Sequence, residues 1–143
     1  MIKYPLQFHA EATAKPGIAT TWTATAENNP PITSAIPPEF MGPGGGYSPE
    51  DLYGIALLNC VIATFKFFAE KSGLTFTDVK GTAEITIDRG DGGKPWISHI
   101  KLHLTLSGAS DPAKGETVLK ESKAACLVCN SMRTNVTLET TVS

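Results

Sequence analysis

The sequence predicts an α+β fold with mainly antiparallel sheets and a long, central, apolar helix. Stretches in which apolar and polar residues alternate occur five times, as in half-buried strands. Residues 51–68 form an apolar run that is too long and continuous for a strand. With 143 residues the chain has room for one core, so we expect a single domain spanning residues 1–143.

The first two predicted strands form a hairpin. Apolar side chains alternate with polar ones in residues 6–15, and the same pattern recurs in residues 21–26. Pro16-Gly17 between them is typical of a turn. Residues 28–47 are rich in proline and glycine, so they predict a loop, which we expect Phe40 and Met41 to order.

The apolar run predicts a helix with a clear beginning and end. Ser48 is a suitable N-cap and Pro49 a suitable first helical residue, and Gly73 is expected to end the helix after about Lys71. The helix is apolar on nearly every face, so it should be buried on all sides. One small sheet covers only one side. We therefore infer a second copy of the chain, in a symmetric dimer.

The second half of the chain predicts two long strands, a helix and a last strand. Alternation in residues 79–88 and 99–106, around a glycine-rich turn, indicates an antiparallel pair. Asp111-Pro112 opens a second helix that runs into Cys126. Val136, Leu138 and Val142 then share one face of a strand. The expected order is β-β-α-β-β-α-β.

Composition and charge limit the possible partners and compartment. The chain is 41% hydrophobic and 18% charged, with a net charge of −2 and no clusters of Lys or Arg, so we expect neither nucleic acid nor an anionic membrane as partner. No signal-peptide-like run follows the start, and polar residues interrupt the long helix. We expect a cytoplasmic protein, in which cysteines serve chemistry rather than a disulfide framework.

Three cysteines are the candidate reactive residues. Cys60, in the middle of the apolar helix, is either a small core residue or a protected reactive thiol. Cys126 begins a Cys-x-x-Cys spacing at a helix end, where thiols tend to be accessible. This spacing has no second ligand pair, and His99 and His103 would lie roughly 13 Å apart on a strand. We therefore expect no metal. The glycines at 44–46 match no dinucleotide-binding fingerprint, and we expect no bound cofactor.

Three blocks together resemble the OsmC/Ohr family, the osmotically inducible protein C and organic hydroperoxide resistance proteins. They are Gly-Gly-Gly-Tyr-Ser-Pro-Glu-Asp-Leu at residues 44–52, Cys60 ten residues after Glu50, and Cys-Leu-Val-Cys-Asn-Ser-Met-Arg at residues 126–133. Residues 68–74 and the element order extend the likeness over essentially the whole chain. The resemblance implies an intertwined homodimer with its long helices at the centre and its active sites at the interface.

The resemblance also implies an antioxidant activity in the oxidative stress response. Cys60 matches the family's peroxidatic cysteine, which reduces an organic hydroperoxide to an alcohol and becomes a sulfenic acid. Cys126 matches the resolving cysteine, which forms an intramolecular disulfide with it. A dithiol such as a lipoyl protein would then be the reductant. An apolar surround would select organic peroxides, and the Ile-, Leu- and Phe-rich helix fits that demand independently.

Glu50 matches the family's active-site glutamate. Ten helical residues span roughly 15 Å, so Glu50 should not touch Cys60 of its own chain. If it contributes to the site, it reaches the partner subunit's site. Alternatively, Glu50 only complements the dipole at the start of the helix.

The chain departs from the family pattern at two positions. The family commonly has an arginine in the first hairpin turn, whereas Lys15 is the only cation near that turn here. Lysine cannot make the same two-pronged pair with a carboxylate. Cys129 stands where the family usually has serine. It is an alternative resolving thiol, a partner that takes Cys126 out of the cycle as a disulfide, or a simple replacement in a partly buried position.

The sequence therefore predicts a thiol-dependent hydroperoxide reductase with Cys60, Cys126 and Glu50 as catalytic residues. Lys15 and Cys129 are accessory candidates. The alternative is an OsmC-like protein that turns over little peroxide and binds a small apolar ligand or senses redox state. The missing arginine favours this alternative, and the retained cysteine pair favours the enzyme.

Overall fold

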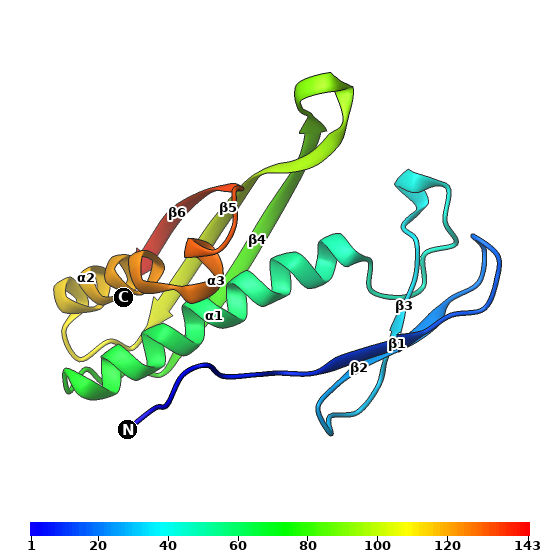
Figure 1. The fold of residues 1–143 in the computed structure, drawn as a ribbon. Helices are drawn as coiled ribbons and strands as arrows, with labels where there is room; N and C mark the ends of the chain where they lie inside the picture. The colour runs from blue at the N-terminus through cyan, green and yellow to red at the C-terminus, as the bar shows by residue number, and fades with distance from the viewer. The chain divides into compact units, whose positions relative to one another are not determined.

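The computed structural model describes residues 1–143, coloured along the chain in Figure 1. The chain forms two compact units, Met1–Leu52 and Tyr53–Ser143. Each unit is described by itself below. The single domain expected from the chain length stays a prediction.

The first unit holds the predicted hairpin and one further strand. β1 (Ala10–Thr13), β2 (Trp22–Ala26) and β3 (Ile32–Ser34) form an antiparallel sheet in the order β1-β2-β3. The hairpin is confirmed, although its first strand begins at Ala10 and not at residue 6. All four residues of β1 are exposed, so this sheet has almost no core of its own.

The proline- and glycine-rich stretch is more ordered than a plain loop. It contains β3 and the short 3-10 helix η1 (Pro38–Phe40). It then returns to β3, where the Ala35 N–H donates to the Tyr47 carbonyl (3.1 Å) and the Tyr47 N–H to the Thr33 carbonyl (2.9 Å). Phe40 and Met41 are 43% and 83% exposed, so the expectation that they order this stretch is wrong. Backbone hydrogen bonds do so instead.

The long helix α1 (Pro49–Lys71) has the predicted bounds. Ser48 Oγ accepts from the Asp51 N–H (3.0 Å), and Asp51 Oδ2 accepts from the Ser48 N–H (2.9 Å), so each satisfies a free donor at the helix start. Gly73 ends the helix with φ = 70°, a conformation that other residues rarely adopt. The Leu74 N–H then donates to the Ala69 carbonyl (2.9 Å).

The second unit is built on a three-stranded sheet. β4 (Asp78–Arg89) and β5 (Pro95–Ser107) form a long antiparallel hairpin closed by η2 (Asp91–Gly93), as the alternation predicted. β6 (Asn135–Val142) runs beside β5, and the order is β4-β5-β6. The β5–β6 pairing is parallel. The sequence did not specify this direction, because alternation is the same in both kinds of sheet.

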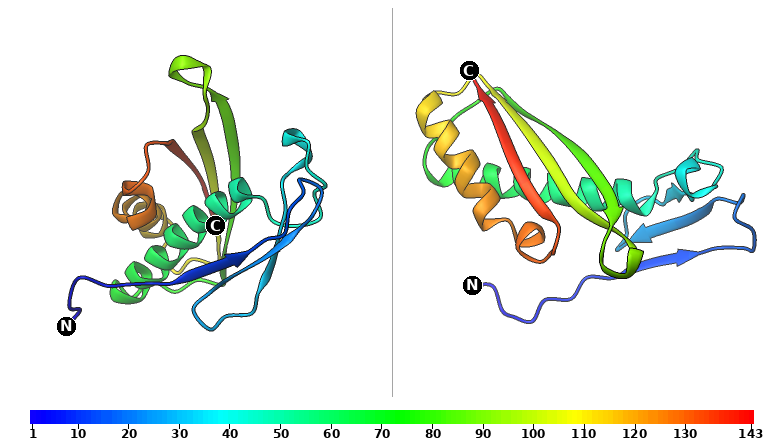
Figure 2. Two further views of the ribbon diagram at one scale, coloured as in Figure 1. Left: turned by 45° about the vertical axis from the view of Figure 1, so that its right-hand side comes forward. Right: turned by 90° about the horizontal axis from the view of Figure 1, so that it is seen from above.

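Two helices cover one face of this sheet. α1 lies along it with α2 (Pro112–Ala125), and the short α3 (Leu127–Asn130) follows α2 (Figures 1 and 2). At Gly54 a Cβ atom would come within 2.5 Å of the Ile85 side chain, so this glycine permits α1 to approach β4 closely. The fully or nearly buried side chains from α1, β5 and α2 form one core: Leu57, Val61, Phe65, Ile100, Leu102, Leu104, Leu106, Val118 and Leu119.

Within one chain α1 is covered on one side only, as expected, and its burial on the remaining sides by a second copy stays a prediction. Its buried side chains follow one stripe, and Phe67 on another face is 58% exposed. By length and composition alone, α1 is long and apolar enough to cross a membrane. Core helices meet the same criterion, and the buried stripe of α1 belongs to the core described above.

Leu57→Ala should lower the free energy of unfolding by about 2–5 kcal/mol, because Leu57 is fully buried and truncation leaves a cavity in the core. Leu127→Ala is the matched control. Leu127 is 72% exposed, so the same truncation should cost less than about 0.5 kcal/mol. Denaturant unfolding of both variants measures the difference, and equal costs would contradict this core.

Candidate functional site: three cysteine thiols

The structure brings the three cysteines together within the second unit. Cys60 comes from the middle of α1, Cys126 ends α2, and Cys129 lies on α3. All three are free thiols. Cys126 is part of the core, and Cys60 and Cys129 pack against it. The sequence could place each cysteine on its helix, but only the packing of α1 beside α3 makes them neighbours.

The Cys60 sulfur is hydrogen-bonded to a backbone amide. The side chain is half-buried, and its Sγ accepts a hydrogen bond from the Val128 N–H (3.5 Å). Such a bond stabilises negative charge on the sulfur, as a thiolate requires. A backbone amide carries no side-chain signal, so sequence patterns could not identify Val128 as part of the site.

Cys126 differs from Cys60 in its burial and in the pKa of its thiol. It is fully buried, and burial, as the largest effect, raises the pKa of its thiol to about 12. The Cys129 N–H donates to Cys126 Sγ (3.3 Å) and works against this rise. A hydrogen bond with the Cys60 side chain and the nearby charges of the Cys60 and Cys129 thiolates raise the pKa of Cys126 further.

The two thiols are therefore chemically different. Cys126 holds its proton at neutral pH, because burial raises the pKa of its thiol to about 12. Cys60 is also the one of the two with solvent access. The arrangement suits an attacking thiolate backed by a protonated second thiol.

An apolar pocket adjoins the cysteines. It has a volume of about 390 Å³, and Val128, whose N–H binds Cys60, is part of its wall. Ala56, one helical turn before Cys60, lines it as well. The full lining comprises Tyr53, Ala56, Leu127, Val128, Ser131, Met132 and Arg133. No cysteine is part of the lining, so the pocket neighbours Cys60 only through Val128 and Ala56. It has room for the organic part of a small molecule.

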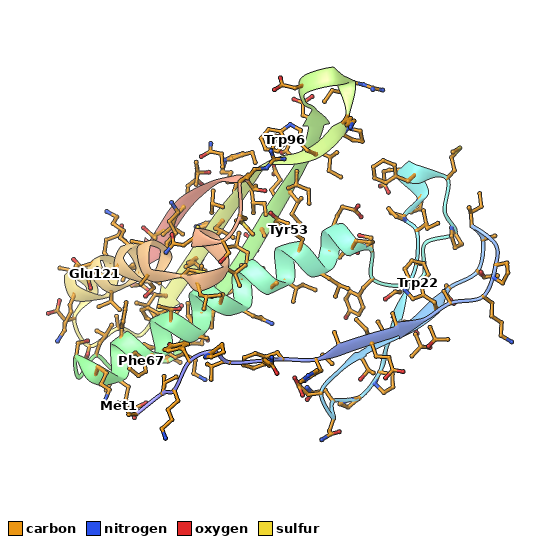
Figure 3. The ribbon with its side chains drawn as sticks, in the orientation of Figure 1. Met1, Trp22, Tyr53, Phe67, Trp96 and Glu121 are labelled. Carbon is orange, nitrogen blue, oxygen red and sulfur yellow. The ribbon has the colours of Figure 1, made fainter.

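Two contacts fix the walls of this pocket, and sequence reasoning missed both. The Thr134 hydroxyl donates to the Ile97 carbonyl (2.8 Å), so the Tyr53 hydroxyl must be the donor in its bond with Thr134 (2.9 Å). The Arg133 guanidinium lies over the Trp96 ring, 5.6 Å from its centroid. Figure 3 labels Tyr53 on α1 and Trp96 at the start of β5.

Glu50 and Lys15 belong to the first unit. Glu50 lies in the first turn of α1, and its Oε2 atom is buried without a hydrogen-bond partner. Lys15 is exposed in the turn between β1 and β2, where its carbonyl accepts from the Thr20 hydroxyl (3.5 Å).

The histidines of β5 bind threonines of the neighbouring strand. His99 Nε2 lies 2.8 Å from Thr137 Oγ1, and His103 Nε2 lies 2.9 Å from Thr141 Oγ1. No group of three or more His, Cys, Asp or Glu side chains is placed to hold a metal ion.

The chain thus combines an α+β fold with two unlike thiols that lie next to each other. The family model for OsmC-like proteins matches residues 42–141, and this chain belongs to that family. The resemblance given by the three sequence blocks is thereby confirmed.

Individual relatives are distant. The uncharacterized protein YmaD of Bacillus subtilis is 29% identical over 120 residues, which are 80% of each chain. Peroxiredoxin OsmC of Escherichia coli is 26% identical over 95 residues, 66% of each chain.

Among solved structures, an OsmC-like protein from Vibrio cholerae superposes with a TM-score of 0.84 at 19% identity, over 95% of this chain and 99% of that one. An organic hydroperoxide resistance protein from Legionella pneumophila gives a TM-score of 0.77 at 21% identity, over 99% of both chains. These likenesses confirm the fold.

Alkylation of the reduced, folded protein at about pH 8 should spare Cys126. Its thiol is fully buried, and a pKa of about 12 keeps it protonated, whereas Cys60 and Cys129 are partly exposed. The expected order of iodoacetamide labelling, followed by peptide mass spectrometry, is Cys60 and Cys129 before Cys126. In denaturant all three should react alike. Early labelling of Cys126 in the folded protein would contradict this division of roles.

Proposed function

We propose that this protein is a thiol-dependent peroxidase that reduces organic hydroperoxides to alcohols. The observation that carries the proposal is the contact between Cys60, which accepts the Val128 N–H, and the protonated Cys126 thiol. This pair meets the two needs of the reaction, a nucleophilic thiolate and a second thiol within reach. The peroxiredoxin name of the Escherichia coli relative supports the same chemistry.

The first step oxidises Cys60. Its thiolate attacks the terminal oxygen of the hydroperoxide, a sulfur–oxygen bond forms, and the oxygen–oxygen bond breaks. The leaving alkoxide takes up a proton and departs as an alcohol. Cys60 becomes a sulfenic acid, and the Val128 N–H that holds its sulfur requires no reorganisation for this step.

The second step forms a disulfide. The Cys126 sulfur attacks the Cys60 sulfenic acid, the hydroxyl group leaves, and the Cys126 proton completes a water molecule. The buried position of Cys126 keeps it from reacting first with peroxide, since it has neither access nor charge. An external dithiol, such as a lipoyl group, then returns the protein to its reduced state.

The substrate class follows from the pocket. Its lining contains Tyr53, Leu127, Val128 and Met132, so it offers more apolar than polar surface to a bound molecule. An alkyl or aryl group seated there would gain from leaving water, whereas hydrogen peroxide has no such group. We infer that organic hydroperoxides are preferred over hydrogen peroxide for this reason.

The same proposal includes a homodimer. The side chains that α1 leaves exposed recur every three or four residues and form one face: Ile55, Ala56, Asn59, Ala63, Lys66, Phe67 and Glu70. Figure 3 labels Phe67, a residue of this face that is 58% exposed. A second copy would cover this face and the thin β1–β3 sheet. Glu50 would then act in the partner's site, where its unpaired Oε2 could find a donor.

Cys60→Ser should abolish turnover of cumene hydroperoxide with a dithiol reductant, because the nucleophile is lost. Cys126→Ser should reduce one equivalent of peroxide and leave Cys60 oxidised, since the resolving thiol is gone. Peroxide consumption and dimedone labelling of the sulfenic acid measure the two effects.

Undiminished turnover by Cys60→Ser would remove the enzyme proposal. Wild-type protein whose Cys60 stays reduced in excess peroxide would favour the alternative, a protein of this fold that binds a small apolar ligand or senses redox state by other means. The absence of an arginine from the turn between β1 and β2 is the observation behind that alternative.

Ala63→Glu should convert the dimer to a monomer. The substitution puts a charge in the middle of the exposed face of α1, where a partner helix would have to desolvate it. Thr82→Glu is the control, because Thr82 is exposed on the face of β4 that no helix covers. Light scattering after size exclusion should report one chain for Ala63→Glu and two for the control and the wild type. A monomeric wild type would refute the dimer.

A further inference from the structure

We propose that Cys129 is a third redox thiol. Its sulfur displaces Cys60 from a Cys60–Cys126 disulfide, and Cys60 is thereby returned to its thiolate before any external reductant acts. This inference rests on the proposed peroxidase function and adds a step to it. It assigns Cys129 a role that the other two cysteines cannot perform.

The first argument concerns how a Cys60–Cys126 disulfide can be opened. A thiol that attacks the Cys60 sulfur must expel Cys126, and burial makes a Cys126 thiolate costly, as its raised pKa of about 12 shows. A thiol that attacks the Cys126 sulfur expels Cys60, whose thiolate the Val128 N–H stabilises. The second route has the better leaving group. However, Cys126 is fully buried, so an external thiol cannot reach the Cys126 sulfur.

Cys129 is an internal thiol on that route. Its N–H donates to Cys126 Sγ (3.3 Å), because Cys126 caps α3 and Cys129 is the third residue of this helix. Residues three apart in a helix have Cα atoms about 5 Å apart, within the range of a disulfide. The Cys129 thiol also lies close enough to influence the titration of Cys126.

The exchange step is balanced without an oxidant or a reductant. The Cys129 thiolate attacks the Cys126 sulfur, the Cys126–Cys129 bond forms, the Cys60–Cys126 bond breaks, and Cys60 leaves as a thiolate. The proton that Cys129 gave up is available to Cys60 or to solvent. A later dithiol reduces the Cys126–Cys129 bond by attacking Cys129, which is only half-buried. This last step still expels Cys126, so the exchange does not ease the final reduction but frees Cys60 before it.

The consequence is a capacity for a second peroxide. Once the exchange has occurred, the regenerated Cys60 thiolate can reduce another hydroperoxide molecule and become a sulfenic acid. Without the exchange, the Cys60–Cys126 disulfide leaves no thiolate at this position. Stoichiometry without reductant therefore distinguishes the two cases.

The experiment titrates reduced wild-type protein and Cys129→Ser with cumene hydroperoxide in the absence of a dithiol. We expect rapid consumption of two equivalents per chain by the wild type and one by Cys129→Ser, with dimedone on Cys60 only in the wild type. Trypsin cuts after Lys123 and Arg133, so a Cys126–Cys129 bond makes peptide 124–133 lighter by two hydrogen atoms. A Cys60–Cys126 bond joins two peptides instead.

A second measurement tests whether the pair can form at all. Cys60→Ser treated with diamide should acquire the Cys126–Cys129 bond, and failure to form it would overturn the exchange. Cys129→Ala should behave as Cys129→Ser does if its melting temperature shows it folded. One equivalent consumed by the wild type, with a stable Cys60–Cys126 bond, would overturn the role of Cys129 and leave the peroxidase intact. No oxidation of Cys60 in any variant would overturn both proposals.

Discussion

The packing of α1 against β5 and α2 is the constraint on which the site depends. Leu57, Val61 and Phe65 form the stripe of α1 that enters the core, and Cys60 lies beside this stripe. The same core receives Cys126 at the end of α2. Cys60 and Cys126 therefore meet because both helices are held on one face of the sheet.

This packing also decides where charge can reside. Cys126 lies in the low-dielectric core, so its ionisation is costly, whereas Cys60 keeps solvent access and a backbone donor. A thiolate supported by a neutral amide needs less compensation from a cation than one in an apolar surround. In the second unit Arg133 is engaged with the Trp96 ring at the rim of the pocket. The Val128 N–H is therefore the contact within this unit that would support a thiolate at Cys60.

Local signals in the sequence predicted local structure well. Ser48 and Gly73 bound α1 where predicted, and Asp111 caps α2 by accepting the Lys114 N–H (3.1 Å). The features that the sequence did not predict depend on contacts between residues far apart in the chain. β3 pairs with β2 through backbone groups, in a stretch whose prolines suggested a loop. The β5–β6 pairing is parallel, and the alternation of apolar and polar residues in β6 does not reveal that direction. The hydrogen bond from Val128 to Cys60 joins residues 68 positions apart and involves a main-chain donor.

The role of Cys129 shows how sequence and structure differ in what they can decide. From sequence, Cys129 was an alternative resolving thiol, an inhibitory partner of Cys126, or an unreactive replacement for serine. In the structure the Cys129 N–H donates to the Cys126 sulfur, so Cys126 is the cysteine of the site that Cys129 contacts. A pairing with Cys126 then need not remove that thiol from the cycle, because the same bond exchange that engages Cys126 releases Cys60. Whether such a bond inhibits or assists depends on which sulfur leaves, and the burial of Cys126 together with the amide at Cys60 favours the departure of Cys60.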